Sequence, residues 1–109
     1  MADVLGAFEQ AVLLAVLRLG EDAYGRAILN EVQARLERDV VPGAVHATLE
    51  RLESKGLLRS QVGTGTPSRA GRARRYYRLQ PSGIRALNDA RAAVDSLWAG
   101  LSWPLRNRT

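Results

Sequence analysis

The sequence predicts a small, mostly α-helical domain with one two-stranded β-hairpin and a long C-terminal helix. Three changes of pattern support this fold class. Apolar residues recur at helical spacing in the first half, alternate with a period of two near Tyr76, and return to helical spacing after Pro81. Segments with Gly or Pro separate these stretches. A chain of 109 residues, 46 % of them apolar, has enough core for one domain and hardly for two.

The first helix is expected over Leu5 to Leu19, where apolar residues occupy most faces and therefore need to be covered on most sides. Gly20 is suited to the left-handed residue that ends a helix. Glu21 and Asp22 then predict the N-cap and a first-turn acid for a second helix. The apolar stripe of that helix is Tyr24, Ile28, Val32 and Leu36.

The third helix is expected to begin at Pro42, because proline fits the first helical turn and biases the residue before it away from helical angles. Gly56 is expected to end this helix. Its buried stripe is Val45, Leu49 and Leu52. The opposite, outward face carries Gly43, His46, Ala47, Glu50, Arg51 and Ser54.

Two short stretches of period two predict strands over Leu58–Val62 and Arg74–Leu79, joined into a hairpin by a polar, Gly-rich loop. A fourth helix is expected from Pro81, with an apolar stripe whose period is close to 3.5 residues. This stripe has more apolar surface than one small domain can bury, so residues 81–109 are predicted to form a dimerisation helix, separate from a domain over residues 1–80. The predicted contacts between protomers are Leu87, Val94, Leu97, Trp98 and Leu101.

The basic residues are concentrated in one part of the chain. No acidic residue occurs from Ser54 to Asn88, although the whole chain has a formal net charge of only +5. The basic residues of that stretch are Lys55, Arg59, Arg69, Arg72, Arg74, Arg75, Arg78 and Arg85. All but one are Arg, whose planar guanidinium can hold phosphate oxygens or a guanine edge through two hydrogen bonds. This pattern predicts a binding site for a polyanion, with nucleic acid as the leading candidate.

Composition argues against several other functions. The chain has no Cys and a single His, so no metal site or other cofactor is predicted. An enzyme is not expected, because no nucleophile with a base and no pair of buried carboxylates can be assembled. The longest apolar run, Ala11–Leu17, is far shorter than the roughly 20 residues that span a bilayer. A cytoplasmic protein without membrane contact is therefore predicted.

Three helices followed by a hairpin is the order of a winged helix-turn-helix, in which the third helix enters the DNA major groove and a basic wing contacts the backbone or the minor groove. The chain also resembles the PadR-like transcriptional regulators, over roughly residues 5–87. The matching pieces, in order, are Leu5-Gly6, Tyr24–Ile28, Gly43–Leu57, and Arg74–Leu79 with Gly83. The sequence departs from the family at His46, where Tyr is usual, and at Gln80, where Thr is the usual and better N-cap.

The resemblance implies a homodimer that represses transcription by occupying a near-palindromic operator in double-stranded DNA. In some members of the family a small aromatic or drug-like ligand relieves repression. The residues predicted to form such a pocket here are Phe8, Val12 and Trp98. An alternative function is a protein- or RNA-interaction module that binds no operator, because a fold does not by itself fix a function.

The predicted DNA contacts lie on the third helix and the wing. They are Gly43, His46, Ala47, Glu50, Arg51, Arg69, Arg72, Arg74 and Arg75. Two of them have a second interpretation: His46 could be an ordinary surface residue, and Arg51 could form a structural ion pair with its neighbours Glu50 and Glu53. The wing arginines have no acidic neighbour in the sequence, so contacts to DNA phosphates are predicted for them.

Overall fold

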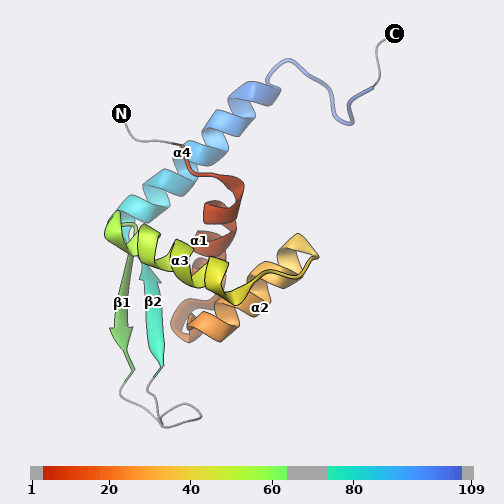
Figure 1. The fold of residues 1–109 in the computed structure, drawn as a ribbon. Coiled ribbons are helices and arrows are strands. Elements are labelled where there is room, and N and C mark those ends of the chain that lie inside the picture. Colours follow the sequence, from red (N-terminus) through yellow and green to blue (C-terminus); the bar gives the residue numbers. More distant parts are fainter. Residues whose placement is uncertain (1–3, 64–73, 107–109) are drawn as a thin grey trace.

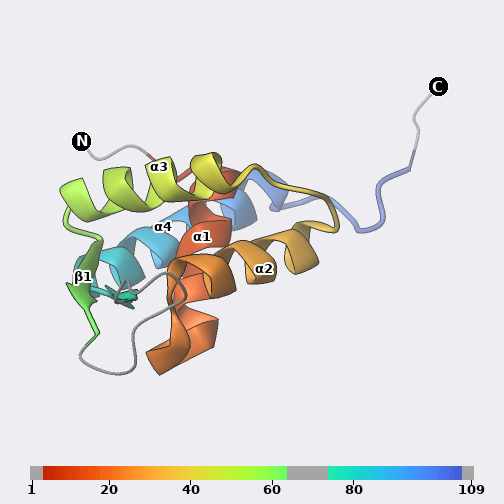
Figure 2. The ribbon, with the colours of Figure 1, turned by 60° about the horizontal axis from the view of Figure 1, so that its bottom comes forward.

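The computed structural model describes residues 4–63 and 74–106, and within these it has four α-helices and one antiparallel hairpin (Figure 1). The elements are α1 (Ala7–Leu19), α2 (Gly25–Leu36), α3 (Pro42–Ser54), β1 (Leu58–Val62), β2 (Arg75–Leu79) and α4 (Pro81–Trp98). The predicted fold class and order of elements are confirmed. In Figure 1 the hairpin and α4 leave the helical core in opposite directions, and in Figure 2 α2 and α3 lie in front of α1.

The hairpin, hereafter the wing, is joined to the segment that precedes α2. Its two strands pair over all five residues of each strand. Tyr24 forms a further antiparallel bridge to Tyr76, and the N–H of Tyr77 donates to the carbonyl of Ala23 over 2.8 Å. The start of α2 is therefore held against the wing by backbone hydrogen bonds.

This pairing explains why α2 begins later than the sequence predicts. Glu21 and Asp22 do not cap α2; they lie in a short 3-10 turn over Gly20–Asp22. Tyr24 is the N-cap and has extended backbone angles, as a residue paired with a strand must have. No side chain caps α2, and its first turn contains no acid. The prediction for this boundary was wrong because strand pairing determined the position of the helix start.

One hydrophobic core is shared by all four helices and the wing. Its largest fully buried side chains are Leu13, Ile28, Leu49, Leu52, Val12 and Val32. Ala90 of α4 is also completely buried, and Ala86 and Leu87 pack against the same cluster. The packing therefore does not divide at residue 80, because the first half of α4 belongs to the same core as α1–α3.

The start of α4 is fixed against the end of α3. Gly56 has a left-handed φ of 79° and ends α3 as predicted. The hydroxyl of Ser82 donates to the carbonyl of Gly56 over 2.7 Å. A Cβ at Gly83 would lie 2.5 Å from the carbonyl oxygen of Leu57 and 2.6 Å from Cδ1 of Leu79. Only a glycine allows α4 to approach the α3–β1 connection this closely.

The second half of α4 extends beyond the core. Val94 and Leu97 follow Ala90 by four and seven residues and so share its helix face, yet Leu97 is 78 % exposed. The radius of gyration of 16.4 Å exceeds the roughly 13 Å of a compact chain of this length. The apolar stripe thus continues where the protomer has no core to cover it.

Two details of the C-terminal region and α1 differ from the prediction. Helix α4 ends at Trp98, so Leu101 is not on the helix stripe; a turn at Gly100, with φ of 83°, separates it. The ring of Trp98 packs edge to face on Trp103, with 5.4 Å between ring centroids. Leu14 and Leu17 of α1 are exposed, so that helix is covered on fewer sides than its composition suggested.

Candidate nucleic-acid interface

The outward face of α3 carries the side chains that the sequence analysis placed there. Gly43, His46, Ala47 and Glu50 are all exposed. His46 Nε2 lies 2.8 Å from Glu50 Oε1, one helical turn away, and both side chains are about two-thirds exposed. An imidazole can donate to or accept from base edges in a major groove, and a carboxylate can accept from them. This face therefore offers polar groups suited to reading bases.

Arg51 has a different environment. Its Nε lies 3.5 Å from Oε2 of Glu9 on α1, and its Nη2 donates to the hydroxyl of Thr48 over 3.4 Å. Lys55 Nζ lies 3.3 Å from the same Glu9 oxygen. The structural ion pair considered for Arg51 exists, but its partner is Glu9 instead of Glu50 or Glu53. Arg51 and Lys55 thus join α3 to α1.

Glu9 is the acceptor that holds this cluster together. Its second oxygen, Oε1, accepts from the N–H of Gly6 over 3.1 Å. Desolvation by burial raises the pKa of Glu9, but the Gly6 hydrogen bond and the cations of Lys55 and Arg51 outweigh it, and the net pKa lies below the ordinary value. The side chain is therefore ionised at neutral pH. Sequence analysis missed this role, although Glu9 is the only acid among the apolar residues of α1.

Arg74, just before β2, lies on a pair of tyrosine rings. The guanidinium carbon of Arg74 lies 4.1 Å from the centroid of the Tyr24 ring, a cation–π contact. Tyr24 in turn meets Tyr76 edge to face, with centroids 5.8 Å apart. These contacts hold the cation at the junction between the wing and α2.

Arg75 is positioned by a second set of contacts, on the α3 side. Its Nη1 donates to the hydroxyl of Ser60 on β1 over 3.0 Å. Ser60 donates through both its N–H and its hydroxyl to Oε2 of Glu53, over 3.1 and 2.7 Å. Glu53 thereby connects the end of α3 to the wing. The predicted contacts Arg69 and Arg72 lie outside the described residues.

The arginines on this surface have no acidic partner among the described residues. Over residues 4–63 and 74–106, no ion pair involves Arg26, Arg74 or Arg75. Of the acids in ion pairs, only Glu50 lies on this surface, beside His46; Glu31 pairs with Arg18 and Arg35, and Glu9 with the α3 cations. Unpaired guanidinium groups beside an exposed helix face form a suitable surface for a polyanion.

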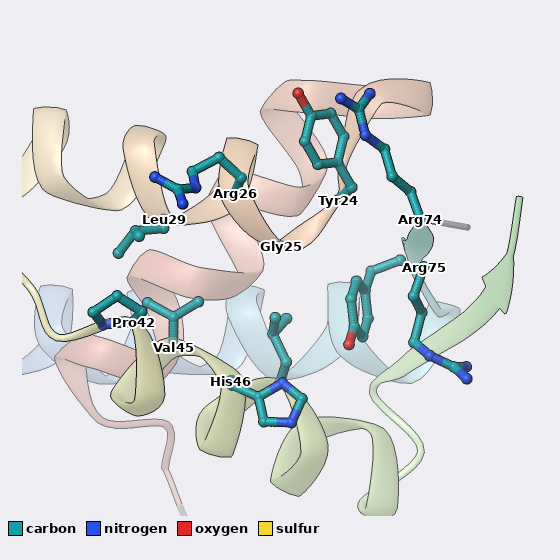
Figure 3. Close-up of a pocket in the computed structure, with 11 residues that line it drawn as sticks. Tyr24, Gly25, Arg26, Leu29, Pro42, Val45, His46, Arg74 and Arg75 are labelled. Carbon is teal, nitrogen blue, oxygen red and sulfur yellow. The ribbon is translucent and has the colours of Figure 1, made fainter. Parts of the chain in front are cut away.

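A pocket of about 630 Å³ opens on the same surface, between the starts of α2 and α3 and the wing (Figure 3). Its lining residues are Tyr24, Gly25, Arg26, Leu29, Pro42, Val45, His46, Leu49, Arg74, Arg75 and Tyr77. Tyr77 is buried, and this desolvation raises the pKa of its phenol; the negative charge of Glu53 raises it further. The phenol therefore stays neutral. Arg26, adjacent to the Tyr24-Gly25 pair, is a further candidate that sequence analysis did not identify.

The residues predicted for an aromatic ligand do not share one environment. Val12 is completely buried in the core, so it lines no open pocket in this protomer. Phe8 is half-buried against the core, and Trp98 is partly exposed at the end of α4. Among the described residues no group of three or more His, Cys, Asp or Glu could hold a metal ion. In the part of the chain that is described, no helix is long and apolar enough to cross a membrane.

Sequence and structural relatives agree with this arrangement. The profile of the "Transcriptional regulator PadR-like family" matches residues 13–89. Transcriptional regulator Rv3488 of Mycobacterium tuberculosis is 38 % identical over 89 residues, which cover 80 % of this chain and 78 % of that protein. The crystal structure of a PadR family transcriptional regulator from Eggerthella lenta superposes with a TM-score of 0.64 at 31 % identity, covering 83 % of this chain and 76 % of that one.

A more distant relative shares the fold alone. BpsR of Bordetella bronchiseptica, a protein whose DNA binding is regulated by 6-hydroxynicotinic acid, superposes with a TM-score of 0.61 at 20 % identity, over 94 % of this chain and 73 % of that one. The family profile covers most of the chain, and the matched segment contains the outward face of α3 and the described part of the wing. The chain therefore belongs to the PadR-like family of transcriptional regulators.

Proposed function

We propose that this chain represses transcription as a homodimer bound to a near-palindromic operator. The observation that carries the proposal is that the outward face of α3 lies beside Arg74 and Arg75, which form no ion pair with any described residue. Helix α3 would enter the major groove and present His46 and Glu50 to base edges. Arg74 and Arg75 would contact the flanking phosphates. Two α3 helices of a dimer would meet half-sites about one helical turn, roughly 34 Å, apart.

The apolar end of α4, defined as Val94, Leu97 and Trp98, supports the homodimer. These side chains are exposed, although they continue the apolar stripe of α4 that is buried in the core at Ala90. A second copy of the chain could cover the exposed part of the stripe through the hydrophobic effect, which also buries its first half. Burial of apolar surface stabilises an association by about 25 cal/mol per Å². Leu101 and Trp103 are exposed just beyond the helix and would extend this interface.

The salt dependence of duplex binding tests the proposal. Fluorescence anisotropy with the chain's own upstream promoter duplex should give a logarithmic slope of affinity against salt that increases with the number of phosphates contacted. A scrambled duplex of equal length is the control: it should bind more weakly by at least about 10³-fold, the lower end of the range for specific binders. A chain that bound duplexes indifferently to salt and sequence would favour the alternative, a protein-interaction module. Tighter binding to RNA than to duplex DNA would favour an RNA module.

Release by a small aromatic ligand is the remaining part of the proposed function. The regulation of BpsR by 6-hydroxynicotinic acid is a precedent within the shared fold. Of the residues anticipated for such a site, Phe8 and Trp98 have exposed surface and Val12 has none. Titration of a site at Trp98 should quench tryptophan emission, whereas a ligand that binds with unchanged emission binds elsewhere.

A further inference from the structure

The two described arginines of the wing are held by different parts of the molecule. Successive residues of an extended chain point to opposite sides, and Figure 3 shows Arg74 and Arg75 leaving the wing in opposite directions. Arg74 lies over the ring of Tyr24, at the start of α2. Among the described residues, the side chain of Arg75 donates to Ser60 on β1. The position of Arg75 therefore depends on what fixes Ser60.

The register of the wing places Ser60 within reach of Arg75. Ser60 lies directly opposite Tyr77, and Arg75 precedes Tyr77 by two residues, so all three share one face of the sheet. Diagonal neighbours of this kind are within reach of a long side chain. Arg75 Nη1 donates to the hydroxyl oxygen of Ser60 over 3.0 Å. A guanidinium carries five N–H donors, so this one bond leaves others to face a further acceptor.

The direction of this hydrogen bond is set by Glu53, in the last turn of α3. A serine hydroxyl has a single proton to donate. The Ser60 hydroxyl donates it to Oε2 of Glu53 over 2.7 Å, and the N–H of Ser60 donates to the same oxygen over 3.1 Å. The hydroxyl oxygen is then an acceptor toward Arg75. One carboxylate oxygen thus fixes β1 relative to α3 and also orients the group that holds Arg75.

The three residues of this relay, Glu53, Ser60 and Arg75, lie beside a buried ring. Burial is the largest cause of the raised pKa of the Tyr77 phenol. Of the charges that act on this pKa, Glu53 raises it and Arg75 lowers it. Both charges are therefore close to Tyr77, which belongs to the core. The relay has packed neighbours on its inner side, and only the guanidinium at its end belongs to an exposed residue.

We propose that Glu53 and Ser60 are positioning residues for DNA binding, which hold the Arg75 guanidinium ready for a phosphate beside the groove that α3 enters, a role that rests on the proposed function. A free arginine side chain loses conformational freedom when a phosphate orders it, and this loss weakens binding. Arg75 is already held by Ser60, so its loss is smaller. Because Glu53 belongs to α3, the same carboxylate also sets the spacing between the base-reading helix and the phosphate contact.

A positioning role gives Glu53 an effect opposite to that of its charge. A carboxylate near a DNA-binding surface repels phosphates, so the loss of its charge alone should strengthen binding. Glu53→Gln and Glu53→Ala both remove the charge, but only Glu53→Ala removes the acceptor oxygen. Glu53→Ala should therefore bind the promoter duplex about threefold more weakly than Glu53→Gln, a change within the range for one net hydrogen bond. If Glu53→Ala bound as tightly as Glu53→Gln, Glu53 would act through its charge and the positioning role would be wrong.

A matched pair of variants tests the hydroxyl of Ser60. Ser60→Thr and Ser60→Val have nearly the same shape and both suit a strand, but only threonine has a hydroxyl. Ser60→Thr should bind the duplex about threefold more tightly than Ser60→Val. Ser60→Val should also have a salt slope lower by about 1, as expected for Arg75→Ala, although no charge is removed. Equal affinities and equal slopes for the two variants would overturn the role of the hydroxyl.

Double variants separate positioning from a merely structural role. If Ser60 acts through Arg75, Ser60→Val should weaken DNA binding no further in a chain that already carries Arg75→Ala. The same change should have its full effect in a chain that carries Arg74→Ala, since Arg74 is held by Tyr24 instead. A structural disturbance of the wing would weaken binding in both backgrounds, and that outcome would overturn the positioning role.

Fluorescence anisotropy with the promoter duplex, at several salt concentrations, measures all of these variants, and their melting temperatures verify folding. A parent chain that bound no duplex at any salt concentration would overturn the proposed function together with the positioning role. A parent that bound the promoter duplex, with Glu53 and Ser60 variants that changed only the melting temperature, would overturn the positioning role and leave the proposed function intact.

Discussion

The two ends of this molecule leave opposite kinds of side chain without partners. On the surface of α3 and the wing, Arg74 and Arg75 are exposed and form no ion pair with any residue in the described ranges. At the apolar end of α4, leucine, valine and tryptophan are exposed although they continue a buried stripe. An exposed charge is stabilised by water and so destabilises the fold little, and it remains available to bind a polyanion, which releases counterions. Exposed apolar surface of this kind usually marks a protein interface.

Under the proposed function, the two surfaces serve separate binding tasks. The core shared by α1–α3, the wing and the first half of α4 connects them. Because each surface depends on a different interaction, one can be changed without the other.

The largest effect is expected at the apolar end of α4. Leu97→Asp should dissociate the proposed dimer. It removes from each protomer a leucine that the dimer would bury and places two carboxylates in the interface, at a cost of at least about 3 kcal/mol in association free energy. Truncation after Asp89 should likewise give a monomer or an insoluble chain. Sedimentation equilibrium measures both. Val41→Asp, which changes a comparably exposed apolar residue away from α4, is the control and should leave the association state unchanged.

A dimer that survived both changes in α4 would overturn the assignment of this helix as the interface. The variant Leu97→Asp should keep the melting curve of a folded helical protein, since the side chain is 78 % exposed and contributes little to the core of one protomer.

The next effect separates the residues that set overall DNA affinity from those that set the preference for one DNA sequence. Replacing Arg74 and Arg75 with Ala should weaken binding to every duplex and lower the salt slope by about 1 for each lost phosphate contact. The pair Arg69 and Arg72 is predicted to behave in the same way. His46→Ala and Glu50→Ala should instead change preference among operator variants, by about 1–3 kcal/mol per lost base contact.

Anisotropy titrations of both variant classes on a set of single-base operator substitutions, at several salt concentrations, separate these effects. If the wing variants changed sequence preference while the α3 variants lowered affinity uniformly, the proposed docking would be incorrect, even for a protein that binds DNA. Sedimentation of the same variants should show an unaltered dimer.

A smaller effect is expected at the junction of α1 and α3. Glu9→Gln should lower the free energy of unfolding at pH 7 by about 1 kcal/mol, because Arg51 and Lys55 lose their charged partner. The pKa of Glu9 is lowered by folding, so its contribution is present above the ordinary glutamate value of about 4.3 and is lost as pH falls through the lowered pKa. Urea denaturation at several pH values should show the two proteins converging on the acid side. If the free energies of unfolding of the two proteins still differed in acid, the substitution would have disturbed the packing of the residue 9 side chain as well as its charge.

The smallest effect is expected at the end of α2. Glu37 occupies the left-handed region, with φ of 53°, where a residue with a Cβ is strained. Glu37→Gly should stabilise the fold by about 0.5 kcal/mol, a balance between relief of that strain and the greater freedom of glycine in the unfolded chain. Glu37→Ala removes the charge and keeps the strain, so it should stabilise less. Equal effects of the two variants would assign the gain to charge alone.

Local sequence patterns were enough to predict the order of the helices and strands and several of their end residues. Helix α3 begins at Pro42 and ends before Gly56, as predicted. Both limits follow from local properties of the chain: the backbone geometry of proline and the left-handed conformation of glycine. Periodicity also predicted the outward face of α3, which is exposed as expected. The acid-free basic stretch predicted a nucleic-acid partner, and the chain belongs to a family of transcriptional regulators.

Contacts between segments far apart in the sequence could not be predicted from local patterns. The start of α2 was set by pairing of Tyr24 with Tyr76, and the partner of Arg51 proved to be Glu9, 42 residues away. The burial of Ala90 places the first half of α4 in the same core as α1–α3. The pocket exists because the starts of α2 and α3 and the wing converge on one surface. Periodicity and capping residues report local backbone preferences, whereas these contacts depend on which elements the shared core brings together.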